Sequence, residues 1–407
     1  MAELIASDEF ARQARHPSFP NAFTRARQLP LPALIASLLS MRAGSQQAML
    51  DEFFGAACGV VEWVRGVSDR AFAKARSHLH MPALQWLNDW LLGQAEQAHF
   101  VARWHGFRLV AADASVLMPA VRPCHQAASA AAADQRLFAL YLPGAELTLY
   151  ANVHSAAESE RAMLMAALDR LGPRDVLLLD RGYPAAWVFQ ILIERGIRFV
   201  ARCDGANWVA VRRFARSGLD EQDVVLSPVS KADAQDWGCQ RAAPSVRLVR
   251  NVAPNGAVRV LATNLRPDEA PAAAFASLYH NRWRIEEAFK RLKLRLHLES
   301  VSGLSQQALI IDVAAKVLAD NIAALMCATA AVDADCALRE RRCNRSYAAK
   351  ALRRLLTPVL LFIGDVIGLI DDALRLLAAN TQRYRPERSR PRQPNRTKPH
   401  PSVAYKG

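Results

Sequence analysis

The sequence has few cysteines, and none of them form a closely spaced pair. Its seven cysteines include no CxxC motif, and no histidine follows the nearest neighbours, Cys336 and Cys343, at zinc-finger spacing. The pattern argues against a disulfide framework and against the common structural zinc sites. It predicts free thiols in a reducing compartment.

Long apolar runs are also absent. No stretch reaches the roughly 18 uninterrupted apolar residues that a membrane span needs, and the most apolar patch, residues 358–370, contains Asp365. The first ten residues, MAELIASDEF, are acidic and have no apolar core, so we expect no secretory signal. We therefore expect a cytoplasmic protein with no membrane partner.

Acidic residues are in deficit. The chain has 38 Asp and Glu against 52 Lys and Arg, which gives a net charge of +14 and a pI near 9.9. Half of this excess lies in residues 381–407, with eight basic residues and one acidic residue. A strongly basic chain favours a polyanionic partner, nucleic acid before a membrane. The 407 residues, 52% of them hydrophobic, can bury one large core or roughly two to three smaller ones.

The first hundred residues are predicted to be helical. Apolar residues recur at helical spacing in four stretches, residues 31–39, 46–54, 68–79 and 81–92. In the third stretch Ser68 can cap the helix, with Arg70, Lys74 and Arg76 facing outward. A short helix, a glycine-containing turn and a basic second helix fit a DNA-reading helix-turn-helix. They fit a plain helical bundle with a basic exterior equally well.

Two apolar runs further along the chain end in aspartate. FRLVAAD predicts a buried strand that ends in Asp113, and DVLLLD predicts a central strand that ends in Asp180. Between them, RLFALYL and ELTLYANV predict two strands, and a helix over residues 157–171 would be capped by Ser155. The strand IRFVAR follows a further helix. This order predicts a mixed α/β domain, although an aspartate at a strand end is usually only a turn residue.

Glu286 comes 106 positions after Asp180, which is too long for a tight connection, so this segment must hold its own structure. NWVAV, DVVL, VRLVRNV and AVRVLATNL predict strands, with a hairpin turn at residues 254–256. Helices are expected over residues 306–331 and 347–378. Residues 339–354 carry seven basic residues against one acidic residue, which makes a plausible phosphate-binding surface.

Residues 278–298, LYHNRWRIEEAFKRLKLRLHL, contain no Gly or Pro and predict one long amphipathic helix. Beside the apolar stripe, a second face within roughly 60° of arc holds four polar side chains: Tyr279, Arg282, Glu286 and Lys293. Such a face is most often a solvated surface with i,i+4 ion pairs. Glu287 lies roughly 80° round from Tyr279, so Glu286 is the preferred functional carboxylate.

The spacing Tyr-x2-Arg-x3-Glu-x6-Lys resembles the signature of the insertion-sequence-four family of DDE transposases, in which the glutamate is the third metal-binding carboxylate. Residues 23–27, 113–115, 180–183 and 262–265 also look like landmarks of that family, in the right order. Ala114 is one departure, because many relatives have glycine there. The resemblance implies an α/β fold with a ribonuclease-H-like mixed sheet, interrupted by a β-rich insertion, between helical N-terminal and C-terminal regions.

The same resemblance assigns roles to individual residues. The catalytic, metal-binding residues would be Asp113, Asp180 and Glu286. Contacts to transposon-end phosphates would come from four residues: Arg181, Tyr279, Arg282 and Lys293. Carboxylates suit Mg²⁺, and two ions, with Mn²⁺ as a substitute, would activate the nucleophile and stabilise the leaving oxygen.

The implied partner is double-stranded DNA, both the terminal inverted repeats and the target, bound by a homodimer on paired ends. Two alternatives remain: a metal-dependent nuclease of the same fold, and a non-catalytic DNA-binding descendant of a transposase. The expected divisions are a helical DNA-binding region (1–100), the first part of the core (105–203), the insertion (204–270), the second part with the catalytic helix (271–330), a helical C-terminal region (331–380) and a disordered basic tail (381–407).

Overall fold

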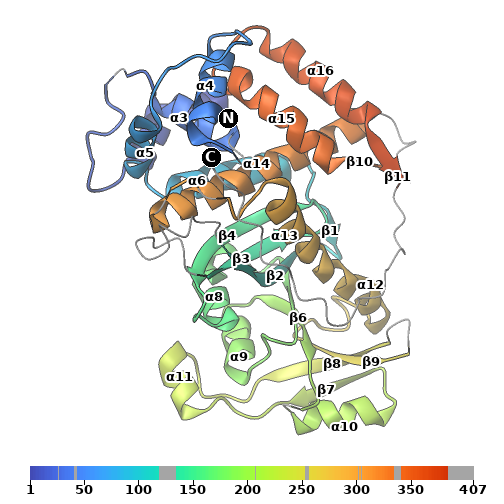
Figure 1. The fold of residues 1–407 in the computed structure, drawn as a ribbon. Coiled ribbons are helices and arrows are strands. Elements are labelled where there is room, and N and C mark those ends of the chain that lie inside the picture. The colour runs from blue at the N-terminus through green and yellow to red at the C-terminus, as the bar shows by residue number, and fades with distance from the viewer. Residues whose placement is uncertain are drawn as a thin grey trace. The chain divides into compact units, whose positions relative to one another are not determined.

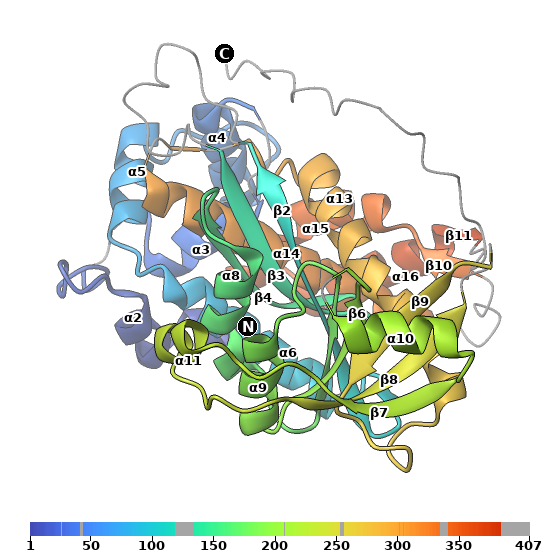
Figure 2. The same ribbon diagram turned by 90° about the horizontal axis from the view of Figure 1, so that it is seen from below.

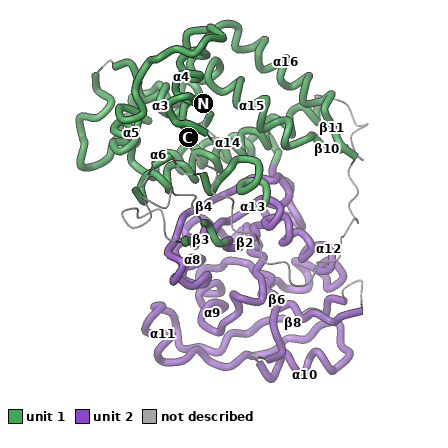
Figure 3. Tube along the Cα trace, viewed as in Figure 1, with its two compact units in different colours: residues 1–100, 116–135, 290–407 green, residues 101–115, 136–289 purple. Residues whose placement is uncertain are grey.

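The computed structural model describes residues 1–25, 27–40, 44–118, 134–206, 208–252, 256–300, 302–303, 305–333 and 341–383. The chain forms two compact units (Figure 3). The first contains residues 1–100, 116–135 and 290–407, and the second contains residues 101–115 and 136–289. Within the described residues, no helix has both the length and the apolar character to cross a bilayer. The predicted basic tail beyond residue 383 lies outside the described residues.

The second unit is built on a mixed sheet. Its strand order is β4-β3-β2-β5-β6-β9-β8-β7, with β1 beside β2 (Figures 1 and 2). β2 and β5 are parallel, and so are β5 and β6. Every residue of β5 is buried: VLLL offers apolar side chains to both faces of the sheet, and Asp175 pairs with Arg108. The strands are β1 (Arg103–Trp104), β2 (Phe107–Leu117), β3 (Gln135–Leu142), β4 (Leu147–Ser155), β5 (Asp175–Leu179), β6 (Arg198–Cys203), β7 (Glu221–Val225), β8 (Ser245–Val252) and β9 (Val258–Thr263).

The insertion continues this sheet. β9 pairs antiparallel with β6, and β8 and β7 follow in order. The strand predicted from NWVAV was wrong: the segment leads into helix α10 (Val209–Ser217), because Val211 and Phe214 recur at helical spacing and are buried together. The sequence pattern also gave no indication of α11 (Lys231–Trp237).

Two predicted helices of the second unit differ from the structure. The helix expected over residues 157–171 is the shorter α8 (Glu160–Ala166), capped by Ser159 rather than Ser155 because the Ser159 hydroxyl accepts from the Ala162 N–H. The helix expected over residues 278–298 is interrupted. It consists of α12 (Phe275–His280), a 3₁₀ turn (Asn281–Trp283) and α13 (Arg284–Arg295), so the prediction of one continuous α-helix was wrong. After β5, helix α9 (Ala186–Glu194) leads to β6.

The first unit is helical. Buried residues of its helices form a single hydrophobic cluster, so the N-terminal and C-terminal helical regions share one core. Ser68 caps α5 as predicted. Arg76 was expected to face outward but is 3% exposed, because its guanidinium pairs with Asp312 and Ser302. The helices are α1 (Ala2–Ile5), α2 (Asp8–Ala14), α3 (Leu31–Ser40), α4 (Gln46–Ala57), α5 (Asp69–Ser77), α6 (Pro82–Gln97), α14 (Gln306–Asp333), α15 (Arg345–Leu360) and α16 (Val366–Ala379), with a ribbon of β10 (Arg341–Cys343) and β11 (Thr381–Arg383).

Candidate active site

Asp113 and Asp180 lie level with each other on adjacent parallel segments. The register of β2 and β5 pairs Ala111 with Leu178, and each aspartate comes two residues later. Asp180 directly follows β5, as predicted. The sequence predicted that Asp113 ends its strand. This prediction was wrong, because β2 continues to Leu117. The extended backbone beyond Asp113 keeps its side chain partly buried in the sheet.

The third carboxylate, Glu286, lies in the first turn of α13 and contacts Arg282. Nη2 of Arg282 donates to Oε1 of Glu286 at 3.0 Å. Nη1 of the same guanidinium is 3.6 Å from Oδ2 of Asp113 and 3.7 Å from Oδ2 of Asp180. The structure therefore brings all three predicted carboxylates together around one side chain.

This cluster contains more negative than positive charge. Arg282 is 3% exposed, and its Nε and Nη1 atoms have no hydrogen-bond partner among the described residues. Burial raises the pKa of Asp113 to about 7, against the opposing charge of Arg282. The charges of Glu160 and Glu286 raise that pKa further. A site with three carboxylates around one guanidinium is electrostatically suited to additional cations.

The three carboxylates are chemically suitable ligands for a hard divalent cation. Carboxylate oxygens are the ligands that Mg²⁺ and Mn²⁺ prefer. Within the described residues, however, no group of three Asp, Glu, His or Cys side chains is placed to hold a metal ion as it stands. The guanidinium of Arg282 supplies the positive charge among the three carboxylates in this arrangement.

Glu286 rather than Glu287 belongs to the cluster. Glu286 makes the ion pair with Arg282, whereas Glu287 is exposed on the next residue of the helix. The preference for Glu286, drawn from helical spacing, agrees with this geometry.

The four residues predicted to contact phosphates lie in different settings. Arg181 is exposed directly after Asp180. Tyr279 is 4% exposed, and its hydroxyl donates to the carbonyl of Leu179 at 3.3 Å. Burial raises the pKa of Tyr279, so it stays a neutral donor. Lys293 lies in the first unit, seven residues after Glu286 on α13, and pairs with Glu299 at 3.5 Å. Arg282 is also buried, at 3% exposure. The contacts of these four residues with phosphates stay predictions.

Helix α8 contributes two residues that the sequence did not single out. Glu160 lies 3.4 Å from Nη1 of Arg136, and burial raises its pKa, with a further contribution from the charge of Asp180. Arg161 holds the loop after Asp180 by donating to the carbonyls of three consecutive residues, Gly182, Tyr183 and Pro184, each at 3.1 Å. Only the serine cap before Glu160 could have indicated this helix start. The contacts themselves are long-range and leave no local signal.

The model of the transposase DDE domain family matches residues 104–322, more than half of the chain. This chain belongs to the DDE transposase family. The matched region starts in β1 and ends within α14, so it includes both aspartates and Glu286. A comparison with curated proteins gives no match. The DDE transposase accordingly has a ribonuclease-H-like α/β fold, and family membership implies an enzyme that cleaves and joins nucleic acid, with DNA as its general substrate.

Proposed function

We propose that this DDE transposase cleaves DNA at the ends of an insertion sequence and joins the freed 3′-hydroxyl to target DNA. The observation that carries the proposal is the convergence of Asp113, Asp180 and Glu286 on Arg282. The assignment to the insertion-sequence-four family is supported by the Tyr-x2-Arg-x3-Glu-x6-Lys spacing along α12 and α13.

Asp113, Asp180 and Glu286 would hold Mg²⁺, as two ions, with Mn²⁺ as a substitute. When bound, such ions lower the pKa of the attacking hydroxyl and stabilise the leaving oxygen of the phosphodiester. Before binding, Asp113 has to lose its proton, and with a pKa of about 7 it does so near neutral pH.

The surrounding residues position this centre. The hydroxyl of Tyr279 holds the carbonyl of Leu179, and Arg161 holds the loop that follows Asp180, so the backbone is held on both sides of Asp180. The exposed guanidinium of Arg181 is free to make a forked contact with a phosphate. Lys293 would act as a point charge toward the same backbone. We further propose that two molecules act on paired ends.

Two other functions would use the same core. A nuclease would cleave without strand transfer, and a non-catalytic descendant would bind DNA without cleaving it. The presence of all three carboxylates in one cluster favours the catalytic forms over the non-catalytic one.

The decisive experiment incubates the full chain with duplexes that carry the flanking inverted repeats, in Mg²⁺ or in Ca²⁺. Asp180→Ala should lower the cleavage rate by about 10³-fold or more while DNA binding is retained. Asp268→Ala is the matched control, because Asp268 is an exposed carboxylate that pairs with neighbouring Arg266. Its cleavage rate should equal that of the parent chain.

Pre-cut end duplexes separate the functions. Joined products with Mg²⁺ support transposition, and cleavage without joined products supports the nuclease. Full cleavage by the Asp180→Ala variant would remove the basis of the proposal.

A further inference from the structure

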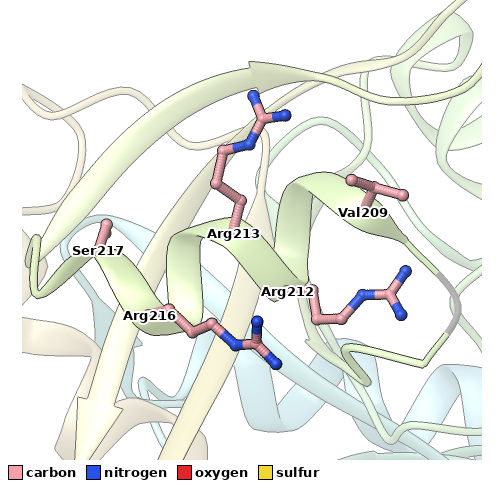
Figure 4. A pocket seen from close by; sticks show the side chains of 5 residues that line it. All are labelled: Val209, Arg212, Arg213, Arg216 and Ser217. Atoms are coloured by element: carbon pink, nitrogen blue, oxygen red, sulfur yellow. The ribbon is translucent and has the colours of Figure 1, made fainter.

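Helix α10 in the insertion presents three arginines on one side. Val211 and Phe214 are buried on the opposite side, at 1% and 0% exposure. Arg212, Arg213 and Arg216 are all exposed and, together with Val209 and Ser217, line a surface hollow of about 470 Å³ (Figure 4). At 100° per residue the three guanidinium-bearing positions fall within roughly 100° of arc. We call these three residues the α10 arginine face.

The α10 arginine face has no structural partners. Within the described part of the chain, none of its three guanidinium groups forms an ion pair or a hydrogen bond, and α10 contains no acidic residue. Nearby arginines in structural roles behave differently. Arg247 pairs with Glu221, and Arg250 donates to the carbonyl of Leu219. Three neighbouring cations without a carboxylate repel one another, so a bound anion would relieve that repulsion.

Helix α10 follows the carboxyl end of β6, and Asp180 follows the carboxyl end of the neighbouring parallel strand β5. β6 runs parallel to β5, and Leu179 pairs with Ala201 near the ends of both strands. From the end of β6 the chain passes through Gly205, which lies against the Arg212 side chain, and enters α10. Two further basic residues, Arg202 on β6 and Arg259 on β9, are close enough to Tyr279 for their charges to act on it. Positive charge is therefore present both on α10 and beside Tyr279.

We propose that the α10 arginine face binds the phosphate backbone of duplex DNA next to the cleavage site. The inference rests on the proposed function, which supplies DNA cleavage as the reaction. Arginine forks match phosphate oxygens, and such contacts position a duplex without reading its sequence. Arg212 and Arg216 are one turn apart, about 6 Å along the helix axis, so both can contact the backbone of one duplex.

The test measures the affinity of the full chain for a random-sequence DNA duplex by fluorescence anisotropy across a salt series of about 50–200 mM. Each phosphate contact contributes about 0.9 to the slope of log K against log salt. The triple variant R212A/R213A/R216A should therefore lose about two to three units of slope. R212K/R213K/R216K keeps the charges and should keep most of the slope. The single variant R216A should lose about one unit, and it serves as the test if the triple variant does not fold.

The matched control is R195A/K231A/R266A, which removes three exposed positive charges elsewhere in the same unit. Its slope should change by less than one unit, because these side chains come from three separate segments and two of them pair with carboxylates. An unchanged slope in the α10 variants overturns the proposal, as does an equal loss in the control. A loss seen with an RNA duplex but not with DNA also overturns it.

Asp180→Ala separates this inference from the proposed function. It should keep the full salt slope while losing cleavage. If no variant, nor the parent chain, cleaves DNA but the slope still depends on the α10 arginine face, then the proposed reaction fails and the DNA-binding surface stands.

Discussion

Each unit of the molecule contains a cluster in which arginine and carboxylate side chains meet, and the two clusters have opposite charge balance. In the first unit, Asp320 is 3% exposed and accepts from Nε of Arg291 at 3.0 Å and from Nη2 of Arg345 at 2.8 Å. In the second unit, Arg282 is the one cation among the described residues that pairs with Asp113, Asp180 and Glu286.

The pKa shifts follow this balance. The two arginines beside Asp320 hold its pKa below the ordinary value in spite of complete burial. Burial raises the pKa of Asp113 to about 7, and one arginine does not offset it. In the first cluster, the charge of the carboxylate is more than offset by its own arginines. A cluster left with excess negative charge marks a place where cations from outside are needed.

The largest effect on stability is expected in the cluster around Asp320. Asp320→Ala removes the buried carboxylate that Arg291 and Arg345 share, and should lower the free energy of unfolding by about 3–5 kcal/mol. Chemical denaturation measures this directly. Asp268→Ala removes an exposed carboxylate and should change it by no more than about 1 kcal/mol. Equal losses in the two variants would contradict the assigned structural role of Asp320.

The second prediction concerns pH and the Asp113 side chain. Its pKa is about 7 in the folded chain against 3.8 for the free group, so the folded state binds more protons between those values and its stability falls as pH rises. Asp113→Asn has no such titration. The free energy of unfolding of the Asp113→Asn variant should therefore exceed that of the parent chain by an amount that grows from about pH 4 and levels off above about pH 7. This difference should stay below about 4 kcal/mol.

Thermal unfolding of both proteins in a chelator, at a series of pH values, measures this difference. Adding Mg²⁺ at pH 8 should stabilise the parent chain more than the Asp113→Asn variant, because an ion that binds only the folded state adds to its stability. A difference that does not change with pH would show that Asp113 titrates normally.

The smallest effect is expected for Glu160. Its negative charge is a minor contributor to the raised pKa of Asp113. Glu160→Gln should therefore move the pH at which the Asp113-linked stability change occurs downward, by a fraction of a pH unit. The same unfolding series measures the shift. Asp169→Asn, at a carboxylate whose side chain is 92% exposed, should leave the midpoint in place, and a shift in both variants would point to overall charge instead.

Local patterns were sufficient for much of the fold. The apolar runs around Asp113 and Asp180 became β2 and β5. The family resemblance added the ribonuclease-H-like fold, which the family match and the mixed sheet support. These features were predictable because they depend on the side chains of one segment and the environment it needs.

Buried charge was not predictable in the same way. Arg282 and Arg76 both lie on helix faces that look solvated in the sequence, yet each is 3% exposed. Their burial depends on carboxylates more than a hundred residues away, such as Asp113 for the first and Asp312 for the second. Helical periodicity reports which face is apolar but not which cation has a remote counter-ion. For the same reason it did not indicate Glu160 or Arg161.

The pairing of β9 with β6 has a mechanical consequence. Four residue pairs, from Val200↔Thr263 to Cys203↔Val260, join the insertion to the strand beside β5. The insertion strands cannot swing as a separate lobe without breaking that backbone ladder. A force that a bound duplex exerts on these strands would be transmitted through the β9–β6 ladder to β6. From β6 it would reach β5 and the segment that carries Asp180.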